Sequence, residues 1–386
     1  MVLVRSVLVA LLAGLVLAAA PVGATVPASC PGTGSISPTT TFTGSFSTAQ
    51  TGDYVMLPVQ VPKGITQLRV RYCWDKPESG GQSHTLDLGI YDGLRRGDKV
   101  WGAKEFRGWG GSSHPEVALS RGGFSSQADY LADPKGYVPG RTTRGFEPGS
   151  IGPGTWAIEL GVGAVIPRSE GDATGEVAWR VEVELSRDTA FGAHPYKPAR
   201  YRTAPVRRKA GWYAGDFHVH SEHSNLGAAT ISETLGYAFR PLSQGGAGLN
   251  FTALSDYVTD TAWDEIGRWQ PRYPKKLIIP SAEVITYHGH LANQNAGGWV
   301  DYRTGPILER TASGALKRLR GPTPPRSVFA AIHRLGGFTV INHPRIFPPI
   351  DPVVAALCRG CYWGYTDKQT DFRRVDAIEV MNSAQA

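Results

Sequence analysis

The stretch Gly-Asp-Phe-His-Val-His-Ser, residues 215–221, decides how the second half of this chain folds. Its pattern is that of a strand running into polar residues, and it places two histidines two positions apart. Residues two apart in a strand point to the same side, so His218 and His220 can hold one metal ion together. Asp216 has the same parity and can orient an imidazole. By itself this H-x-H is a moderate signal, because histidine pairs also occur as ordinary surface residues.

From Gly211 onward, strand-like segments alternate with helix-like ones, which predicts a parallel β/α architecture. We expect strands over 212–220, 249–254, 277–283, 338–341 and 375–380, and helices over 231–239, 261–269 and 327–335. Polar side chains stand where these strands stop, and such folds place their active sites there. Those that can bind a metal at or near later strand ends are Asp256, Glu283, His290 and His343. Their positions strengthen the interpretation of the H-x-H as part of a metal site.

The preceding region, residues 26–186, has the alternation of half-buried strands. Over 177–185, for example, Val, Trp, Val, Val and Leu alternate with Ala, Arg, Glu and Glu. Several short strands without a convincing amphipathic helix predict an antiparallel β-sandwich. We expect the glycine-rich stretch 101–149 to be an irregular insertion. Residues 187–210, rich in Pro and Arg, are expected to be a linker, with binding of an acidic ligand as the alternative.

Six motifs of the second half resemble, in their order, those of the polymerase-and-histidinol-phosphatase (PHP) family of metal-dependent hydrolases. They are residues 215–221, 248–256, 281–284, 289–290, 342–344 and 379–382. The resemblance is closest to the exported, amidohydrolase-like branch, and it covers residues 211 to about 382, under half of the chain. It implies a distorted (β/α)7 barrel over 211–386 with a metal cluster at the strand C-termini. The expected fold class is therefore an N-terminal all-β sandwich followed by an α/β barrel of PHP type.

The resemblance also implies which residues hold the metal. For two divalent ions (Zn, Mn or Fe), the implied ligands are His218 and His220 for the first, Glu283 as the bridge, and His290 with His343 for the second. His288 competes with His290 for its place, and the Gly-His step favours His290. The loop residue His223 could approach the cluster, whereas His333 is expected to be a packing or surface residue on a helix face.

Two departures from the family pattern concern a third metal. The family has Asp after Ser in the loop that follows H-x-H, and His after Asp at the end of the second strand, where this chain has Asn225 and Tyr257. Neither neutral side chain supplies what a tight third site needs. We therefore expect a dinuclear site, with Asn225 and Tyr257 facing the substrate. The expected catalytic residues are Asp256, Tyr257, Asn225 and Arg345. Arg345 is expected to hold an anionic substrate, with a surface role as the alternative. The family's last motif, Asp-x-His, does not occur before Ala386, so either the sequence is truncated or the barrel lacks its last element or elements, and the activity is expected to be reduced or absent.

Composition and charge limit the class of protein. The 386 residues are 41% hydrophobic and include 10 Trp, 15 Tyr and 13 Phe, which excludes intrinsic disorder. A formal net charge of +7 is mild for this length and is no argument for a nucleic-acid partner.

The four cysteines are expected to form the disulfides Cys30–Cys73 and Cys358–Cys361, with half of a zinc site at the C-x-x-C as the alternative.

The N-terminus predicts the compartment. Residues 1–24 have the pattern of a cleaved secretory signal, since Arg5 precedes an apolar run over 7–20 that is short of the ~20 residues of a membrane span. An uncleaved anchor and a lipoprotein site at Cys30 are the alternatives.

The expected protein is thus a secreted metal-dependent hydrolase of small-molecule ester substrates. Phosphate esters suit the site best, and carbamates, amides or carboxylic esters are the alternative. The rival is a non-catalytic secreted protein whose sandwich binds a cell-surface glycan.

Overall fold

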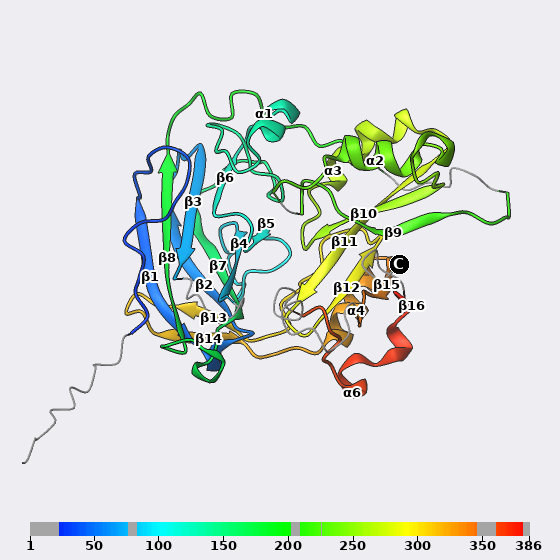
Figure 1. The fold of residues 1–386 in the computed structure, drawn as a ribbon. Helices are drawn as coiled ribbons and strands as arrows, with labels where there is room; N and C mark the ends of the chain where they lie inside the picture. Colours follow the sequence, from blue (N-terminus) through cyan, green and yellow to red (C-terminus); the bar gives the residue numbers. More distant parts are fainter. Residues whose placement is uncertain (1–22, 76–82, 202–208, 225, 346–359, 381–386) are drawn as a thin grey trace, which may run out of the picture.

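The structure is a computed structural model that describes residues 23–75, 83–201, 209–224, 226–345 and 360–380. The expected signal sequence falls almost wholly outside these ranges, as do Asn225 and Cys358. Within the described ranges, no helix has the length and apolar character to cross a membrane. The strands form three sheets, of which two lie in the N-terminal part and one in the C-terminal part (Figure 1).

The two N-terminal sheets face each other across a common apolar core, as a sandwich does. The first has the order β1 (Thr40–Ser47), β8 (Glu176–Ser186), β3 (Gln67–Trp74), β6 (Glu116–Ser120), with every pair antiparallel. The second has the order β14 (Leu316–Arg320), β13 (Ile307–Arg310), β2 (Tyr54–Val61), β7 (Gly154–Ala164), β4 (Thr85–Tyr91), β5 (Phe106–Gly111). Val177, Val181 and Val183 of β8 are fully buried in the core between them. The alternation predicted over 177–185 is therefore that of β8.

The glycine-rich stretch 101–149 is not the irregular insertion that the sequence predicted. It contains β5 in the second sheet, β6 in the first, and the helix α1 (Gln127–Ala132). Gly108 shows why the alternation of side chains did not predict the strand β5. A Cβ atom at Gly108 would lie 2.5 Å from the Cα atom of Phe146. The strand β5 therefore needs a glycine at a position where a regular strand alternation would show a side chain.

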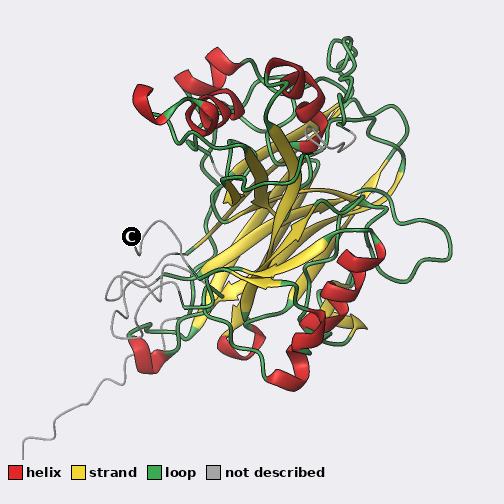
Figure 2. Cartoon of the chain, turned by 90° about the vertical axis from the view of Figure 1, so that its right-hand side faces the viewer, coloured by secondary structure: helices red, strands yellow, loops and turns green. Residues whose placement is uncertain are grey.

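The third sheet is a curled, mixed sheet that makes about half of a barrel. Its order is β16 (Ala377–Ile378), β15 (Phe338–Ile341), β12 (Gly289–Gln294), β11 (Leu277–Thr286), β10 (Phe251–Tyr257), β9 (Gly215–Val219). Neighbouring strands are parallel except that β12 is antiparallel to both β11 and β15. The helices α2 (Ile231–Phe239), α3 (Trp263–Trp269) and α4 (Pro325–Arg334) lie within two residues of their predicted bounds. In the described residues few helices accompany this sheet, and a complete (β/α)7 barrel is not shown (Figure 2).

A hairpin from the second half of the chain joins the sandwich. The strand β13 pairs in parallel with β2, placing Ile307 opposite Tyr54, and β14 extends the sheet beyond it. The sequence analysis did not foresee this crossing, because Ile307 is the one fully buried apolar side chain of the hairpin. The outer face of the second sheet also shares an apolar core with the third sheet. In that core the rings of Phe106 and Trp299 stack with centroids 4.2 Å apart.

Candidate metal centre

The carboxylate of Glu283 lies at the centre of a cluster of imidazoles. Its Oε2 atom is 3.0 Å from Nε2 of His218 and 3.3 Å from Nε2 of His220. Its Oε1 atom is 3.2 Å from Nδ1 of His290 and 2.9 Å from Nε2 of His343. The structure therefore brings together all five residues that the sequence analysis proposed as ligands, with one pair of histidines on each carboxylate oxygen.

Strand register explains how this cluster forms. Glu283 lies in the middle of β11, and the hairpin pairs Ile285 of β11 with His290 of β12. Because Glu283 and Ile285 share one face of the strand, His290 projects on the same side as Glu283. His343 follows directly after β15 with a backbone φ of 25°, a conformation that residues other than glycine seldom adopt. Such strain costs of order 1–3 kcal/mol and is concentrated at functional sites.

The buried charges of the cluster depend on one another. Burial alone would raise the pKa of Glu283, but the positive charge of His218 and the hydrogen bonds of the histidines hold that pKa well below its usual value. Burial likewise disfavours a charged His218, yet the charge and hydrogen bond of Glu283, together with Glu379, raise the pKa of His218 to about 10. The cluster thus stabilises a cation between its carboxylates, and a divalent ion can replace the proton in that place.

Glu379, just beyond β16, is a part of the site that the sequence analysis missed. Nδ1 of His218 lies 3.1 and 3.3 Å from the two carboxylate oxygens of Glu379, and the backbone N–H of His343 donates to one of them at 2.8 Å. A carboxylate behind an imidazole fixes the ring so that its other nitrogen faces the metal position. The signal was present, since residue 379 opens the last motif that resembles the PHP family, but no role was assigned to it.

A chain of hydrogen bonds behind His220 fixes the orientation of this second imidazole. The hydroxyl of Ser224 lies 2.9 Å from Nδ1 of His220 and donates its hydrogen to Asp256 at 2.7 Å. Since that hydrogen is committed to the carboxylate, Nδ1 of His220 must be the donor to Ser224, which leaves Nε2 facing Glu283. Asp256 also accepts hydrogen bonds from the N–H and hydroxyl of Ser221, at 2.7 and 2.8 Å. Asp256 is fully buried and reaches the cluster through Ser224, rather than facing a substrate as its predicted catalytic role requires.

The other predicted substrate-facing residues differ in position. Tyr257 lies beside His220 with ring centroids 4.3 Å apart. Burial raises the pKa of its hydroxyl, with Glu283 adding to the effect, so the phenol stays protonated at neutral pH. Arg345 is exposed. Asp216, expected to orient an imidazole, accepts a hydrogen bond from the backbone N–H of His218 at 2.9 Å.

The remaining histidines of the region lie elsewhere. His288 is exposed in the turn between β11 and β12, so the hairpin gives His290 and not His288 to the cluster. His223 is fully buried, its Nδ1 atom is 2.8 Å from the hydroxyl of Thr261, and burial lowers its pKa well below the usual value. His333 on α4 pairs with Asp376 at 2.8 Å.

The donor set of the cluster suits divalent ions. Three overlapping groups each have their donor atoms within 4.8 Å of one another: His218 with His220 and Glu283, His218 with His343 and Glu379, and His290 with His343 and Cys361. Cys361 is disulfide-bonded, so its sulfur is not a free thiolate. Nδ1 of His343 is buried and has no hydrogen-bond partner in the described part of the chain. Imidazoles with carboxylates are the ligands of Zn, Mn and Fe sites, and the residues present fit such ions.

A cavity of about 790 Å³ opens beside the cluster and gives access to it. His218 and His220 lie in its wall, together with Leu131 of α1, Tyr237 of α2 and Leu249. The helix α1 is held over this region because the hydroxyl of Tyr130 accepts a hydrogen bond from the N–H of Gly227 at 2.9 Å. Among the described residues of the wall there is neither Lys nor Arg.

The disulfide expected between Cys30 and Cys73 is present. The sequence analysis expected Cys361 to pair with Cys358, which lies outside the described residues.

Comparisons with known proteins add little to this geometry. No family model matches the sequence, and no curated protein matches it. One solved structure that matches is a two-domain protein from Bacteroides vulgatus ATCC 8482, described as containing a predicted PHP-like metal-dependent phosphoesterase. The match has 18% sequence identity and a TM-score of 0.27, and it covers 44% of this chain and 44% of that protein. The chain thus spans less than half of the protein it matches, and we draw no functional conclusion from so distant a likeness.

Proposed function

We propose that this chain is a metal-dependent hydrolase of the PHP type that acts on phosphate esters with two bound divalent ions. The observation that carries this proposal is the contact of one buried carboxylate, Glu283, with four imidazoles that come from three different parts of the sheet. A buried carboxylate that is backed by further carboxylates is costly to bury unless a positive charge, either a protonated imidazole or a bound metal ion, compensates it.

The residues of the site divide into ligands and supports. His218 and His220 would hold the first ion, Glu283 would bridge both ions, and His290 and His343 would hold the second. When bound, the ions supply a water whose pKa is lowered toward ~7 and polarise the scissile group of the ester. Glu379 keeps Nε2 of His218 aimed at the centre, and the Ser224–Asp256 pair does so for His220. Tyr257 stays protonated next to His220 and can donate a hydrogen bond to a substrate oxygen.

One observation favours a second candidate function on the same site. The wall of the 790 Å³ cavity holds apolar side chains, and in the part that the structure describes it lacks Lys and Arg, the residues that bind a phosphate dianion. A phosphate diester, which carries one charge, or a neutral carbamate or carboxylic ester therefore fits this wall better than a phosphate monoester does. We rank a phosphodiester as the first candidate substrate and a neutral ester as the second.

The test compares hydrolysis of p-nitrophenyl phosphodiesters, phosphomonoesters and acetate by the full chain loaded with Mn²⁺ or Zn²⁺. His218→Ala is expected to lose activity, because it removes a ligand of the proposed first ion. His333→Ala is the matched control, since that histidine lies on α4 and pairs with Asp376 instead of with the cluster. Equal activity of His218→Ala and the wild type would exclude this mechanism. Three tightly bound ions per chain, measured by elemental analysis, would contradict the dinuclear site.

The alternative of a non-catalytic binding protein gives a different result in the same assay. In that case the chain binds metal with the expected stoichiometry but hydrolyses none of the esters. We further propose that the protein is exported, as the Cys30–Cys73 disulfide is consistent with an oxidising compartment.

A further inference from the structure

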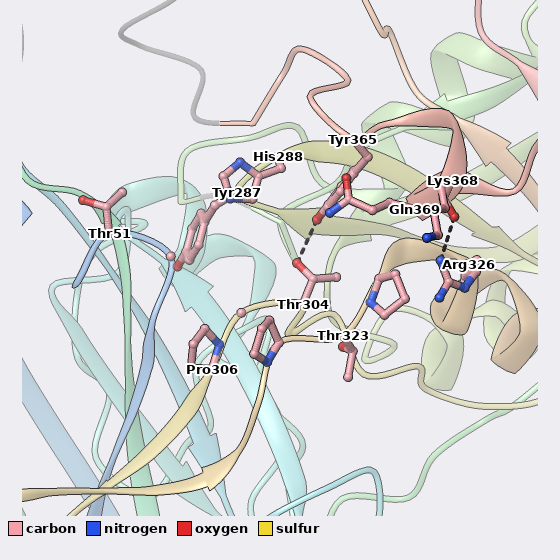
Figure 3. A pocket seen from close by; sticks show the side chains of 14 residues that line it. Thr51, Tyr287, His288, Thr304, Pro306, Thr323, Arg326, Tyr365, Lys368 and Gln369 are labelled. Carbon is pink, nitrogen blue, oxygen red and sulfur yellow. Dashed lines mark hydrogen bonds between the residues drawn. The ribbon is translucent and has the colours of Figure 1, made fainter. Parts of the chain in front are cut away.

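A second pocket, of about 480 Å³, lies at the junction of the sandwich and the mixed sheet (Figure 3). It is lined by the turn before β2, the turn between β11 and β12, the segments on either side of the β13–β14 hairpin, and α6 (Asp367–Thr370). It shares no lining residue with the cavity beside His218. A pocket of this size is typical of a small-molecule site.

The wall of the pocket combines flat rings with fixed hydroxyl groups. The hydroxyl of Tyr365 lies 2.7 Å from that of Thr286 and 2.8 Å from that of Thr304, so this ring is held by β11 and by the segment that precedes β13. The hydroxyl of Tyr287 donates to Asp87 at 2.8 Å. The other rings of the wall belong to His288, Pro306, Pro322 and Pro324. The pocket is therefore formed before any ligand binds, and rings interspersed with hydroxyls suit the apolar faces and hydroxyl groups of a sugar.

The charge of the lining is positive. Arg326 of α4 and Lys368 of α6 both line the pocket, and none of its described lining residues is Asp or Glu. The guanidinium of Arg326 donates one hydrogen bond to the backbone carbonyl of Lys368 at 2.6 Å, which fixes it at the wall (Figure 3). Among the described residues neither side chain forms an ion pair. An anionic group of a ligand would balance both charges, and an arginine can bind it through two parallel hydrogen bonds.

We propose that this pocket binds an acidic sugar, a pyranose ring that carries a carboxylate or a phosphate. The anionic group pairs with Arg326 and Lys368, and the ring lies against the tyrosine and proline wall. The polar side chains of Thr323 and Gln369, which also line the pocket, hydrogen-bond the sugar hydroxyls. This site does not depend on the hydrolase activity proposed above, because the metal cluster contributes no residue to it.

The test is calorimetric titration of the full, metal-loaded chain with four probes: glucuronate, glucose 6-phosphate, glucose and inorganic phosphate. We expect one or both acidic sugars to bind and neutral glucose to bind at least about tenfold more weakly. The double variant Arg326→Gln/Lys368→Gln should weaken the acidic sugar by at least about tenfold, because both charge-assisted contacts are lost. Arg334→Gln is the matched control, since Arg334 is exposed in the last turn of the same helix.

A second variant distinguishes anion binding at the metal centre from binding in the proposed pocket. His218→Ala should keep the affinity for the acidic sugar, whereas loss of binding in His218→Ala but not in the double variant would overturn the proposed location. The proposal is also overturned when neither acidic sugar binds the wild type. Equal affinity for inorganic phosphate and glucose 6-phosphate would refute the carbohydrate part of the proposal, because the ring would then contribute nothing. Binding of one acidic sugar but not the other identifies the carboxylate or the phosphate as the group recognised.

Discussion

Replacement of Glu379 should weaken metal binding in two graded steps. Oε2 of Glu379 is the acceptor for both Nδ1 of His218, at 3.1 Å, and the backbone N–H of His343, at 2.8 Å. In Glu379→Gln the amide oxygen can take this position, so the geometry is kept and only the charge is lost. In Glu379→Ala this acceptor disappears, and His218 and His343 lose its support together.

The magnitude follows from this difference. Loss of a carboxylate behind a ligating histidine costs 10- to 100-fold in metal affinity, or about 1.4 to 2.7 kcal/mol. We place Glu379→Gln near the lower end, at about tenfold, and Glu379→Ala near the upper end, at about 100-fold. The rank order of the two variants is the part of the prediction that depends on the observed contacts.

Zinc affinity is measured by competition with a fluorescent chelator, on protein whose thermal unfolding shows that it remains folded. Glu176→Gln is a suitable control, since Glu176 is exposed at the start of β8. An affinity of Glu379→Ala within twofold of the wild type would refute the supporting role of this carboxylate. A loss in Glu379→Gln that exceeds the loss in Glu379→Ala would show that the assumed geometry is wrong.

Three further predictions concern stability, each measured by urea denaturation. Burial raises the pKa of Asp87 from 3.8 to about 7, so the folded state keeps a proton that the unfolded chain releases, and stability should fall as the pH rises from 4 to 7. Asp87→Asn should remove this decline in stability of about 4 kcal/mol, and an unchanged pH dependence of the variant would contradict the prediction. Reduction of the Cys30–Cys73 disulfide, which spans 43 residues, should cost about 3–4 kcal/mol, and a cost near zero would oppose the prediction. Arg303→Met leaves the buried Glu159 without its partner at 3.2 Å and should cost about 3–5 kcal/mol, whereas a stabilising effect would show that the pair is dispensable.

Local patterns in the sequence predicted individual elements well. The helix expected over 231–239 is α2, and the strand expected over 338–341 is β15. Both depend on side-chain periodicity and on short-range signals, such as the capping box in which Thr230 and Glu233 bond each other at the start of α2. These interactions lie within a few residues, so they can be read without the fold.

The sequence placed imidazoles and a carboxylate at or near the predicted strand ends, and hence His218, His220, Glu283, His290 and His343 were candidates for one site. Only the tertiary structure decided how they meet. The antiparallel direction of β12 puts His290 rather than His288 beside Glu283.

The supports of the site were likewise decided by the fold. Glu379 lies 161 residues from His218 in sequence, and the pair exists because β9 and β16, the two edges of one curled sheet, approach each other. Asp256 was expected to be a catalytic residue but is buried behind Ser224. The physical reason is the same in each case. Residue type and spacing fix what a side chain can do, but the pairing of strands distant in sequence fixes its neighbours, and these determine its charge, its orientation and its role.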